Sequence, residues 1–338
     1  MSWIDSYNRW LGCETLTDEQ RAELCGLDEK EIKERFLGCL EFGTAGLRGK
    51  MGMGTAMMNE YVVRHATQAF AQVILEESGE KRSAGVCICH ECAASVMAAN
   101  GIRVRIFDDM RPTPELSFAV RYYGAAAGIN VTASHNPKEY NGYKVYWSDG
   151  AQLPPAHADK IAAIMAEIDI FDGVKTMDFE TACKNGLISI MGQETDEAFL
   201  KKVLAMSGDY APEELDRSFK IVYTPFHGTG YKLIPYVLRK IGVENLCCVE
   251  EQMITDGSVP TVKSPNPENP EGFELAVRLA DRVGADFIIG SDPDADRVGM
   301  MIRKKDGKFY PITGNLAGVL LFDYFASSLE RQGKMPEN

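Results

Sequence analysis

Three aspartates stand close together in the second half of the chain. Asp292, Asp294 and Asp296 follow the apolar run 287–290, so they are predicted to lie at the carboxyl end of a buried strand. In open α/β sheets, ligands bind at that edge. Carboxylates this close repel one another unless a cation lies between them, and their hard oxygens suit Mg²⁺ or Mn²⁺. The alternative is a solvated acidic turn; the position after a strand and the adjacent Arg297 favour a metal site.

A serine in an earlier loop could supply a second kind of chemistry. Ser134 follows the apolar run 128–131, has His135 as its neighbour, and precedes Lys144 by ten residues. The pattern does not indicate a hydrolase triad, because triad members are brought together by the fold and no G-x-S-x-G elbow is present. A serine that merely lies in an exposed turn would also explain this pattern. An exposed serine with a histidine and a lysine nearby also suits phosphoryl transfer, since cations stabilise developing charge and histidine can move a proton.

Two glycine-rich segments could approach a phosphate closely. Segment 43–54 holds five glycines together with Arg48 and Lys50, and this density predicts a loop rather than a regular element. The segment has neither the P-loop spacing nor the dinucleotide-binding spacing. Segment 223–230 predicts a turn before a helix whose N-terminus could hold an anion, and a purely structural turn explains it equally well.

The composition excludes several classes of protein. The 36 Lys and Arg against 49 Asp and Glu give a net charge of −13 over 338 residues, which argues against a nucleic-acid or membrane-surface binder. No apolar run reaches the ~18 residues of a membrane helix, and the N-terminus does not resemble a secretory signal. The nine cysteines are scattered, and Cys89 and Cys92 make only half a zinc site. The sequence predicts a soluble, cytoplasmic enzyme with reduced thiols.

The elements that must position these residues alternate between short apolar runs and helical patterns. A helical lead-in is expected at 15–40, and two α/β units follow. The predicted strands are 86–89, 104–107, 128–132, 143–147, 219–224, 246–250, 287–290 and 298–302. One helix is predicted to begin near residue 60, and four others are predicted at 93–99, 231–241, 273–283 and 316–329. We expect domain 1 at 1–190, domain 2 at 191–305, and the start of a third at 306–338.

Taken together, three blocks resemble the α-D-phosphohexomutase superfamily, most closely its phosphoglucomutase/phosphopentomutase branch. They are 43–49, 132–144 and 292–297, in the order that the family has them. The resemblance extends over essentially the whole chain. It implies consecutive α/β mixed-sheet domains, of which the third is only begun here and the fourth is absent.

The resemblance also implies roles for the site residues. Ser134 would be carried as a phosphoserine, and Asp292, Asp294 and Asp296 would hold one Mg²⁺ together with a phosphoserine oxygen. A phosphoserine carries about −1.5 to −2 charges at pH 7, so three carboxylates beside it require a divalent ion. The reaction would pass the phosphate to a sugar phosphate, giving a sugar 1,6-bisphosphate that reorients and returns its other phosphate to the serine.

The cations of the chain would act on the phosphate being transferred. Arg48 and Lys144 would stabilise it or assist proton movement, and His135 would help from the serine loop. Arg297 would contact the phosphoserine or the incoming phosphate; Asn136 and Lys50 complete the expected phosphate-binding set. Because Lys144 is expected on an exposed loop, its replacement by alanine should slow the chemistry more than it harms folding.

The sequence departs from the family in two places. Members place an Asp-x-Arg after the strand at 86–89, whereas here Cys89 runs directly into His90. The sugar-binding loop of the third domain and the phosphate cradle of the fourth are not found, so we expect an N-terminal portion that binds Mg²⁺ and turns over poorly by itself. A phosphopentomutase, a phosphomannomutase, a sugar-bisphosphate synthase, a Mg²⁺-dependent phosphatase and a non-catalytic fragment stay open as alternatives to glucose phosphate interconversion.

Overall fold

The computed structural model describes residues 2–132, 134–207 and 216–336. The chain divides into two compact units. Unit 1 comprises Met1–Asp109, Leu116–Ala133 and Glu139–Met191, and unit 2 comprises Met110–Glu115, Ser134–Lys138 and Gly192–Asn338. Two short segments from the first half of the sequence therefore belong with the second half.

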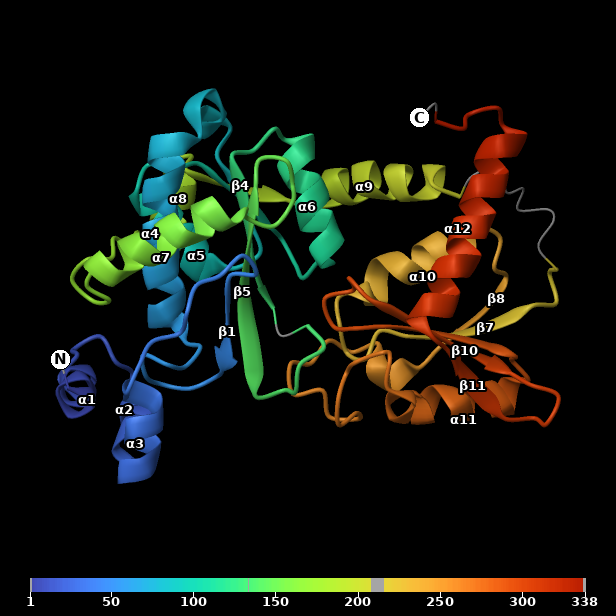
Figure 1. Ribbon diagram of the computed structural model, residues 1–338, viewed down its shortest axis with the longest axis horizontal. Helices are drawn as coiled ribbons and strands as arrows, with labels where there is room; N and C mark the ends of the chain where they lie inside the picture. Colours follow the sequence, from blue (N-terminus) through green and yellow to red (C-terminus); the bar gives the residue numbers. More distant parts are fainter. Residues whose placement is uncertain (1, 133, 208–215, 337–338) are drawn as a thin grey trace. The chain divides into compact units, whose positions relative to one another are not determined.

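Unit 1 is built on a six-stranded mixed sheet in the order β1-β5-β4-β2-β3-β6. β4, β2, β3 and β6 are parallel, and β5 and then β1 extend the sheet antiparallel (Figure 1). The strands are β1 (Leu47–Lys50), β2 (Val86–Ile88), β3 (Val104–Phe107), β4 (Ala127–Thr132), β5 (Tyr140–Trp147) and β6 (Ile188–Met191). The helix between β2 and β3 is the crossover that a parallel pair requires.

Helices cover both faces of this sheet. Side chains of α4, α5, α7 and α8 form the main core with Val86, Ile88, Tyr143 and Val145, while α6 packs on the opposite face against Cys87. The bounds are α4 (Glu60–Glu77), α5 (Glu91–Ala99), α6 (Thr113–Tyr122), α7 (Pro155–Glu167) and α8 (Phe179–Lys184), with a 3₁₀ helix η1 (Gly79–Ala84). Successive residues of β2 enter two different cores, which explains why this central strand is apolar throughout.

Three short helices precede the sheet: α1 (Trp3–Leu11), α2 (Asp18–Cys25) and α3 (Glu29–Phe36). Each begins with a capping box. The side chain of the N-cap residue (Ser2, Thr17 or Asp28) accepts a hydrogen bond from a backbone N–H three residues later, and the side chain of that later residue accepts one from the backbone N–H of the N-cap residue. A good N-cap stabilises a helix by roughly 1 kcal/mol. Trp10, fully buried among aromatic rings, holds the three helices to unit 1.

Unit 2 has a five-stranded sheet in the order β11-β10-β9-β7-β8. β8, β7 and β9 are parallel, and β10 and β11 continue antiparallel. The strands are β7 (Lys220–Thr224), β8 (Asn245–Cys248), β9 (Phe287–Ser291), β10 (Val298–Arg303) and β11 (Phe309–Ile312); the helices are α9 (Gln193–Ala205), α10 (Gly230–Lys240), α11 (Glu274–Val283) and α12 (Gly314–Arg331), with 3₁₀ helices η3 (Glu250–Gln252) and η4 (Pro270–Phe273). Its core joins α11 to Val222 and Ile288.

The predicted α/β class is confirmed, and every predicted strand and helix is present within a few residues of its expected ends. One prediction is wrong: the glycine-rich segment is not a loop throughout, because β1 lies inside it and pairs with β5. Glycine is required there rather than disruptive. Gly46 has φ +79°, and a Cβ on it would meet the carbonyl oxygen of Tyr143 at 1.8 Å.

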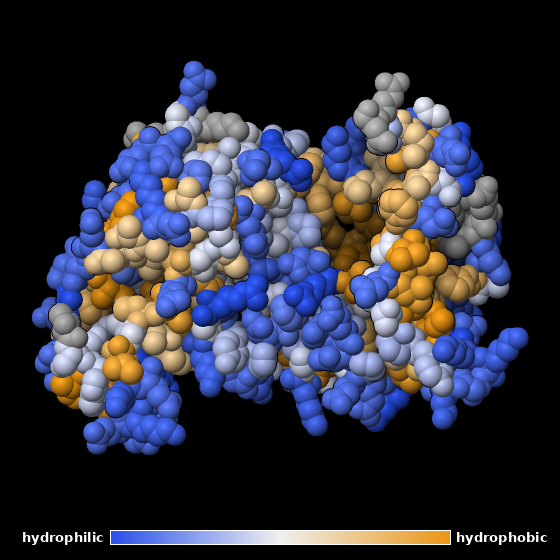
Figure 2. Space-filling view, in the orientation of Figure 1, coloured by the Kyte–Doolittle hydropathy of each residue, from blue (hydrophilic) through white to orange (hydrophobic). Residues whose placement is uncertain are grey.

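The surface of α12 is apolar. Figure 2 shows hydrophobic side chains gathered over this helix, and they include Leu316, Val319, Leu320, Leu321 and Phe322, the last of which is 76% exposed. Despite that character, no helix in the described parts of the chain has the combination of length and hydropathy needed to cross a bilayer.

Candidate phosphoryl-transfer and metal site

The three aspartates lie in the loop of a β hairpin in unit 2. β9 ends at Ser291 and β10 begins at Val298, so the loop leaves the carboxyl end of a parallel strand, as the sequence predicts. Asp292 and Asp294 are buried, whereas Asp296 is exposed. One oxygen or more from each carboxylate lies within 4.8 Å of the others, and this trio is the only such His/Cys/Asp/Glu group found among the described residues.

Backbone donors fix the most buried carboxylate. Asp292 Oδ1 accepts hydrogen bonds from the backbone N–H of Asp296 (3.1 Å) and of Arg297 (3.0 Å). Ala295 has φ +54°, an uncommon conformation for a residue with a side chain, and its N–H bonds to the carbonyl of Asp292. The loop therefore turns back around Asp292.

The electrostatics of the loop favour a bound cation. The pKa of Asp292 is raised to about 8, chiefly by burial and then by the charge and hydrogen bond of Asp294 and the charge of Asp296, while the backbone bond from Arg297 opposes the rise. Two buried carboxylates and a third at the surface are costly together in water-poor surroundings. Oxygen donors of this kind and spacing fit a hard divalent ion such as Mg²⁺.

Ser134 belongs to unit 2 and lies against this loop. Its Oγ donates to Asp292 Oδ2 at 3.2 Å and lies 3.1 Å from His135 Nδ1. The expectation of an exposed serine is wrong, because Ser134 is only 3% exposed. Its φ of +55° is the sort of backbone strain that concentrates at functional sites. The predicted juxtaposition of serine and aspartates is thus present.

The other two predicted residues of unit 2 lie on the same two loops. Asn136 follows Ser134 by two positions and is half-buried. Arg297 closes the aspartate loop, where its backbone N–H bonds to Asp292, and its side chain is also half-buried. Both positions are compatible with contact to a group bound at Ser134.

The remaining predicted cations lie in unit 1, on neighbouring strands. Arg48 and Lys50 are on β1, and Lys144 is on β5. Arg48 pairs with Gly142, two residues before Lys144, so all three side chains leave the same face of the sheet. Lys144 is not on an exposed loop as expected; it lies in a strand and is 4% exposed.

The turn at 223–230 supports the aspartate loop. The backbone N–H of Thr229 donates to the carbonyl of Pro293 at 2.7 Å, and a Cβ on Gly228 would meet the Cα of Pro293 at 2.2 Å. His227 is buried and its ring nitrogens lie 2.8 Å from the carbonyl oxygen of Ile254 and 2.9 Å from Thr261 Oγ1. Of the two interpretations left open by the sequence, these contacts favour the structural one.

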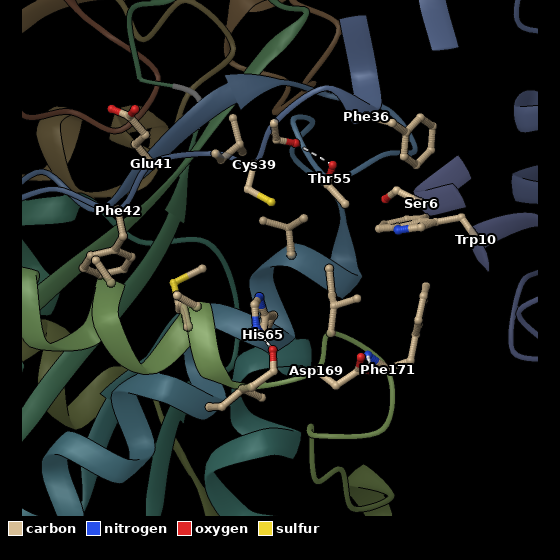
Figure 3. A pocket seen from close by; sticks show the side chains of 18 of the residues that line it. Ser6, Trp10, Phe36, Cys39, Glu41, Phe42, Thr55, His65, Asp169 and Phe171 are labelled. Carbon is tan, nitrogen blue, oxygen red and sulfur yellow. Dashed lines mark hydrogen bonds between the residues drawn. The ribbon is translucent and has the colours of Figure 1, made fainter. Parts of the chain in front are cut away.

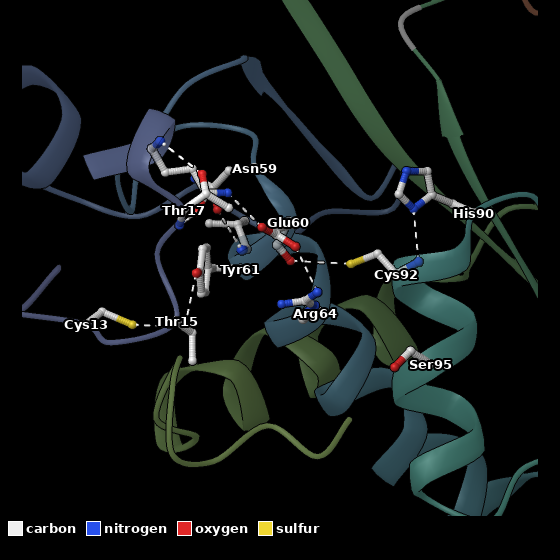
Figure 4. Close-up of polar contacts among 12 residues, drawn as sticks. Cys13, Thr15, Thr17, Asn59, Glu60, Tyr61, Arg64, His90, Cys92 and Ser95 are labelled. Carbon is white, nitrogen blue, oxygen red and sulfur yellow. Dashed lines mark hydrogen bonds and ion pairs between the residues drawn. The ribbon is translucent and has the colours of Figure 1, made fainter. Parts of the chain in front are cut away.

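A cavity and a partly buried cysteine of unit 1 involve none of the predicted phosphoryl-transfer residues: none of them lines the cavity, and none is hydrogen-bonded to the cysteine in the part of the chain that the structure describes. Unit 1 has a cavity of about 770 Å³ whose lining includes Trp10, Phe36, Phe42 and His65 (Figure 3). Cys92, one of the two cysteines of the half zinc site, packs between helices instead. Its Sγ donates to the backbone carbonyl of Glu60 in α4, and burial raises the pKa of its thiol to about 11 (Figure 4).

The sequence interpretation missed a buried charge cluster in unit 2. Arg111 donates from Nε to Asp196 Oδ1 (2.7 Å) and from Nη2 to Oδ2 (3.1 Å), and Lys232 lies 3.3 Å from the same carboxylate. Glu115 is fully buried beside it. The residues are too far apart in sequence for spacing to reveal the cluster. The one local signal is a pair of prolines, Pro112 and Pro114, directly after Arg111.

Glu115 is expected to make stability depend on pH. Burial raises its pKa to about 8, helped by a hydrogen bond to and the charge of Asp196, and opposed by Arg111 and Lys232. As a carboxylate it accepts no hydrogen bond from any described residue, whereas in its protonated form it can donate one to Asp196. The folded chain therefore retains a proton that the unfolded chain has lost, so its stability falls as the pH rises from about 4.5 to about 8, by at most about 1.4 kcal/mol per pH unit.

The variant Glu115→Gln tests this, because glutamine keeps the donor without titrating. Its free energy of unfolding in urea should match that of the parent near pH 4.5 and exceed it increasingly toward pH 8. Glu197→Gln, on the exposed side of α9, is the matched control and should follow the parent at every pH. Parallel pH profiles for the parent and Glu115→Gln would show that Glu115 does not hold the proton.

Comparison with known families agrees with this architecture. Residues 40–170 match the sequence model for phosphoglucomutase/phosphomannomutase α/β/α domain I, and residues 197–307 match the one for α/β/α domain II. Together these ranges include Ser134 and all three aspartates. The chain belongs to the phosphoglucomutase/phosphomannomutase family, and the resemblance to the α-D-phosphohexomutase superfamily is confirmed.

Individual relatives place the chain within that family. It is 36% identical to a phosphoglucomutase of Staphylococcus saprophyticus over 301 residues, which are 87% of this chain and 54% of the relative. It is 35% identical to a phosphoglucomutase of Staphylococcus aureus, with 87% and 53% covered. The chain spans about half the length of these curated relatives.

Solved structures share the fold. A phosphoglucomutase/phosphomannomutase family protein from Burkholderia thailandensis aligns with a TM-score of 0.59 and 22% identity, covering 79% of this chain and 55% of that one. Parafusin, a phosphoglucomutase from Paramecium, aligns with a TM-score of 0.56 and 19% identity, covering 78% and 52%.

Proposed function

We propose that this chain carries the phosphoserine and metal-binding parts of a phosphosugar mutase that interconverts glucose 1-phosphate and glucose 6-phosphate. The observation that carries the proposal is the 3.2 Å contact between Ser134 Oγ and Asp292 in the aspartate loop. The curated relatives named above are phosphoglucomutases at 35–36% identity, which favours glucose phosphates over pentose and mannose phosphates. A phosphomannomutase, a phosphopentomutase and a bisphosphate synthase share the same first half-reaction.

Asp292, Asp294 and Asp296 would hold Mg²⁺ together with an oxygen of phosphorylated Ser134. When bound, the ion would offset the carboxylate charges and part of the phosphate charge. The raised pKa of Asp292 supports this assignment, because it reflects burial and the nearby charges of Asp294 and Asp296, which a bound cation would offset. Mg²⁺ is preferred because all the donors are hard oxygens.

Ser134 would alternate between a hydroxyl and a phosphate ester. In the first half-reaction a sugar hydroxyl oxygen bonds to phosphorus, the bond from phosphorus to Ser134 Oγ breaks with its electron pair remaining on Oγ, and the hydroxyl proton passes to a base. In the second half, Oγ loses its proton and bonds to the phosphorus of the other phosphate, the bond from that phosphorus to the sugar oxygen breaks with its electron pair remaining on the sugar oxygen, and this oxygen takes up a proton to regenerate a hydroxyl. His135, whose Nδ1 lies 3.1 Å from Oγ, would move a proton at that oxygen.

The cationic side chains would stabilise the transferring group. Arg48 can bind phosphate oxygens through its planar fork, and Lys144 supplies a compact charge from the same sheet face. Arg297, Asn136 and Lys50 would bind substrate or phosphoserine oxygens. Sugar phosphates are therefore the partners we expect, in an enzyme of the cytoplasm.

Replacing Lys144 by methionine is expected to slow phosphorylation of Ser134 by glucose 1,6-bisphosphate about 10-fold, because one cation is lost from the transition state. Methionine is the better test than alanine: Lys144 is buried in β5, and a long side chain preserves its packing. Quenched-flow labelling gives the rate, and thermal unfolding gives the stability. Lys201→Met, at an exposed position on α9, should leave both unchanged; an unaltered rate in Lys144→Met would remove Lys144 from the mechanism.

Phosphopeptide mapping tests the proposal as a whole. The purified chain is incubated with Mg²⁺ and glucose 1,6-bisphosphate, digested and analysed by mass spectrometry. We expect one phosphoryl group, on the peptide that contains Ser134. Phosphate elsewhere, or none after incubation with a panel of sugar bisphosphates, would contradict a phosphoserine carrier and favour the non-catalytic alternative.

A further inference from the structure

Thr113 makes two hydrogen bonds to a single residue of the aspartate loop. Its backbone N–H donates to the carbonyl oxygen of Asp294 at 2.9 Å, and its hydroxyl Oγ1 donates to Asp294 Oδ2 at 2.9 Å. Both residues are buried, with Thr113 5% and Asp294 2% exposed. The first bond fixes the backbone of the loop, and the second fixes the plane of one carboxylate.

The segment that carries Thr113 is itself held firmly within unit 2. Arg111, two residues earlier, makes the bidentate pair with Asp196 of α9 at 2.7 and 3.1 Å. Prolines precede and follow Thr113, and each has a restricted φ. They also line a small apolar cavity of about 170 Å³ together with side chains of α9 and α10 and with Ala295 of the aspartate loop.

From these contacts we infer that Thr113 is a positioning residue for the metal site: its hydroxyl holds the orientation of the Asp294 carboxylate, which together with Asp292 and Asp296 would hold the ion. This inference rests on the proposed function, since it concerns the same aspartates. The hydroxyl acts through Asp294 and would not itself contact the metal. Groups that hydrogen-bond to metal-binding side chains typically change metal affinity 10- to 100-fold when they are removed.

A purely structural role for Thr113 makes a different prediction. The backbone N–H bond alone would hold the loop, and that bond survives any side-chain replacement except proline. Thr113→Val removes the hydroxyl and keeps the shape of the side chain, whereas Thr113→Ser keeps the hydroxyl. If the hydroxyl matters for the metal, valine weakens binding and serine retains it.

Unit 2 provides a matched control in contact with the same loop. Thr229 also donates its backbone N–H to the aspartate loop, at the carbonyl of Pro293 (2.7 Å), but its hydroxyl has no hydrogen-bond partner among the residues that the structure describes. Thr229→Val is therefore the same chemical change beside the same loop, without a bond to a carboxylate.

The test titrates the chain with Mn²⁺ and follows free Mn²⁺ by electron paramagnetic resonance, with Mg²⁺ as competitor. We expect the dissociation constant of Thr113→Val to rise about 10-fold, and those of Thr113→Ser and Thr229→Val to stay within about 3-fold of the parent. Without metal, Thr113→Val should unfold at a lower temperature than the other three proteins, because Asp294 loses a buried hydrogen bond, so all titrations are made well below the unfolding temperatures. Equal Mn²⁺ affinity in Thr113→Val and the parent would overturn the inference alone; a parent chain that binds no Mn²⁺ would overturn the metal site of the proposed function itself.

Discussion

Replacing Ser134 by alanine is expected to abolish phosphoryl transfer to this chain, with a loss on the order of 10³-fold or more. Alanine lacks the oxygen to which phosphorus would bond, so no covalent intermediate can form. Ser134 already has a positive φ that alanine must also adopt, and folding should change little because the backbone demand is the same. Transfer is measured by intact mass and by incorporation of labelled phosphate from glucose 1,6-bisphosphate.

Ser258→Ala is a suitable control for this variant. Ser258 is an exposed serine of unit 2 on a turn, and its removal leaves Ser134 and the aspartate loop intact. The control should accept phosphate at the parental rate. Undiminished labelling of Ser134→Ala would mean that another residue carries the phosphate, and peptide mapping of that variant would identify it.

Much of the site was predictable because its parts are local in sequence. Asp292, Asp294 and Asp296 follow a strand directly, so a short apolar run and three charges suffice to place them at a sheet edge. Ser134 follows β4 in the same way. The contact between the two loops was not predictable from spacing, since it joins residues 158 positions apart; only the family resemblance implied it.

The sequence could not predict the residues that support the site. Arg111 and Asp196 are 85 positions apart and Thr113 and Asp294 are 181 apart, and no periodicity connects them. Local pattern also misled at two positions. The glycines of segment 43–54 suggested a loop, although the close approach of Gly46 to Tyr143 requires one of them. Lys144 was assigned to an exposed turn that begins at Asn141, whereas β5 buries it.

Asp294→Asn is expected to weaken divalent-metal binding about 100-fold, because one charged donor becomes neutral while the side chain keeps its shape. Without metal the same change should stabilise the fold. Asp294 is the chief charged neighbour that makes the buried Asp292 carboxylate unfavourable, and asparagine removes that repulsion. Mn²⁺ titration measures the affinity, and thermal unfolding with and without Mg²⁺ measures the stability.

These opposite effects separate a metal site from simple structural damage. A misfolded variant would have both a lower metal affinity and a lower stability without metal. A variant that replaces a metal ligand, as we expect of Asp294→Asn, has a lower metal affinity but a higher stability without metal. Asp323→Asn, at an exposed position on α12, makes the same change in net charge and should alter neither quantity. If Asp294→Asn bound Mn²⁺ as tightly as the parent, the acidic loop would not be the metal site, and the buried aspartates would need another compensating charge.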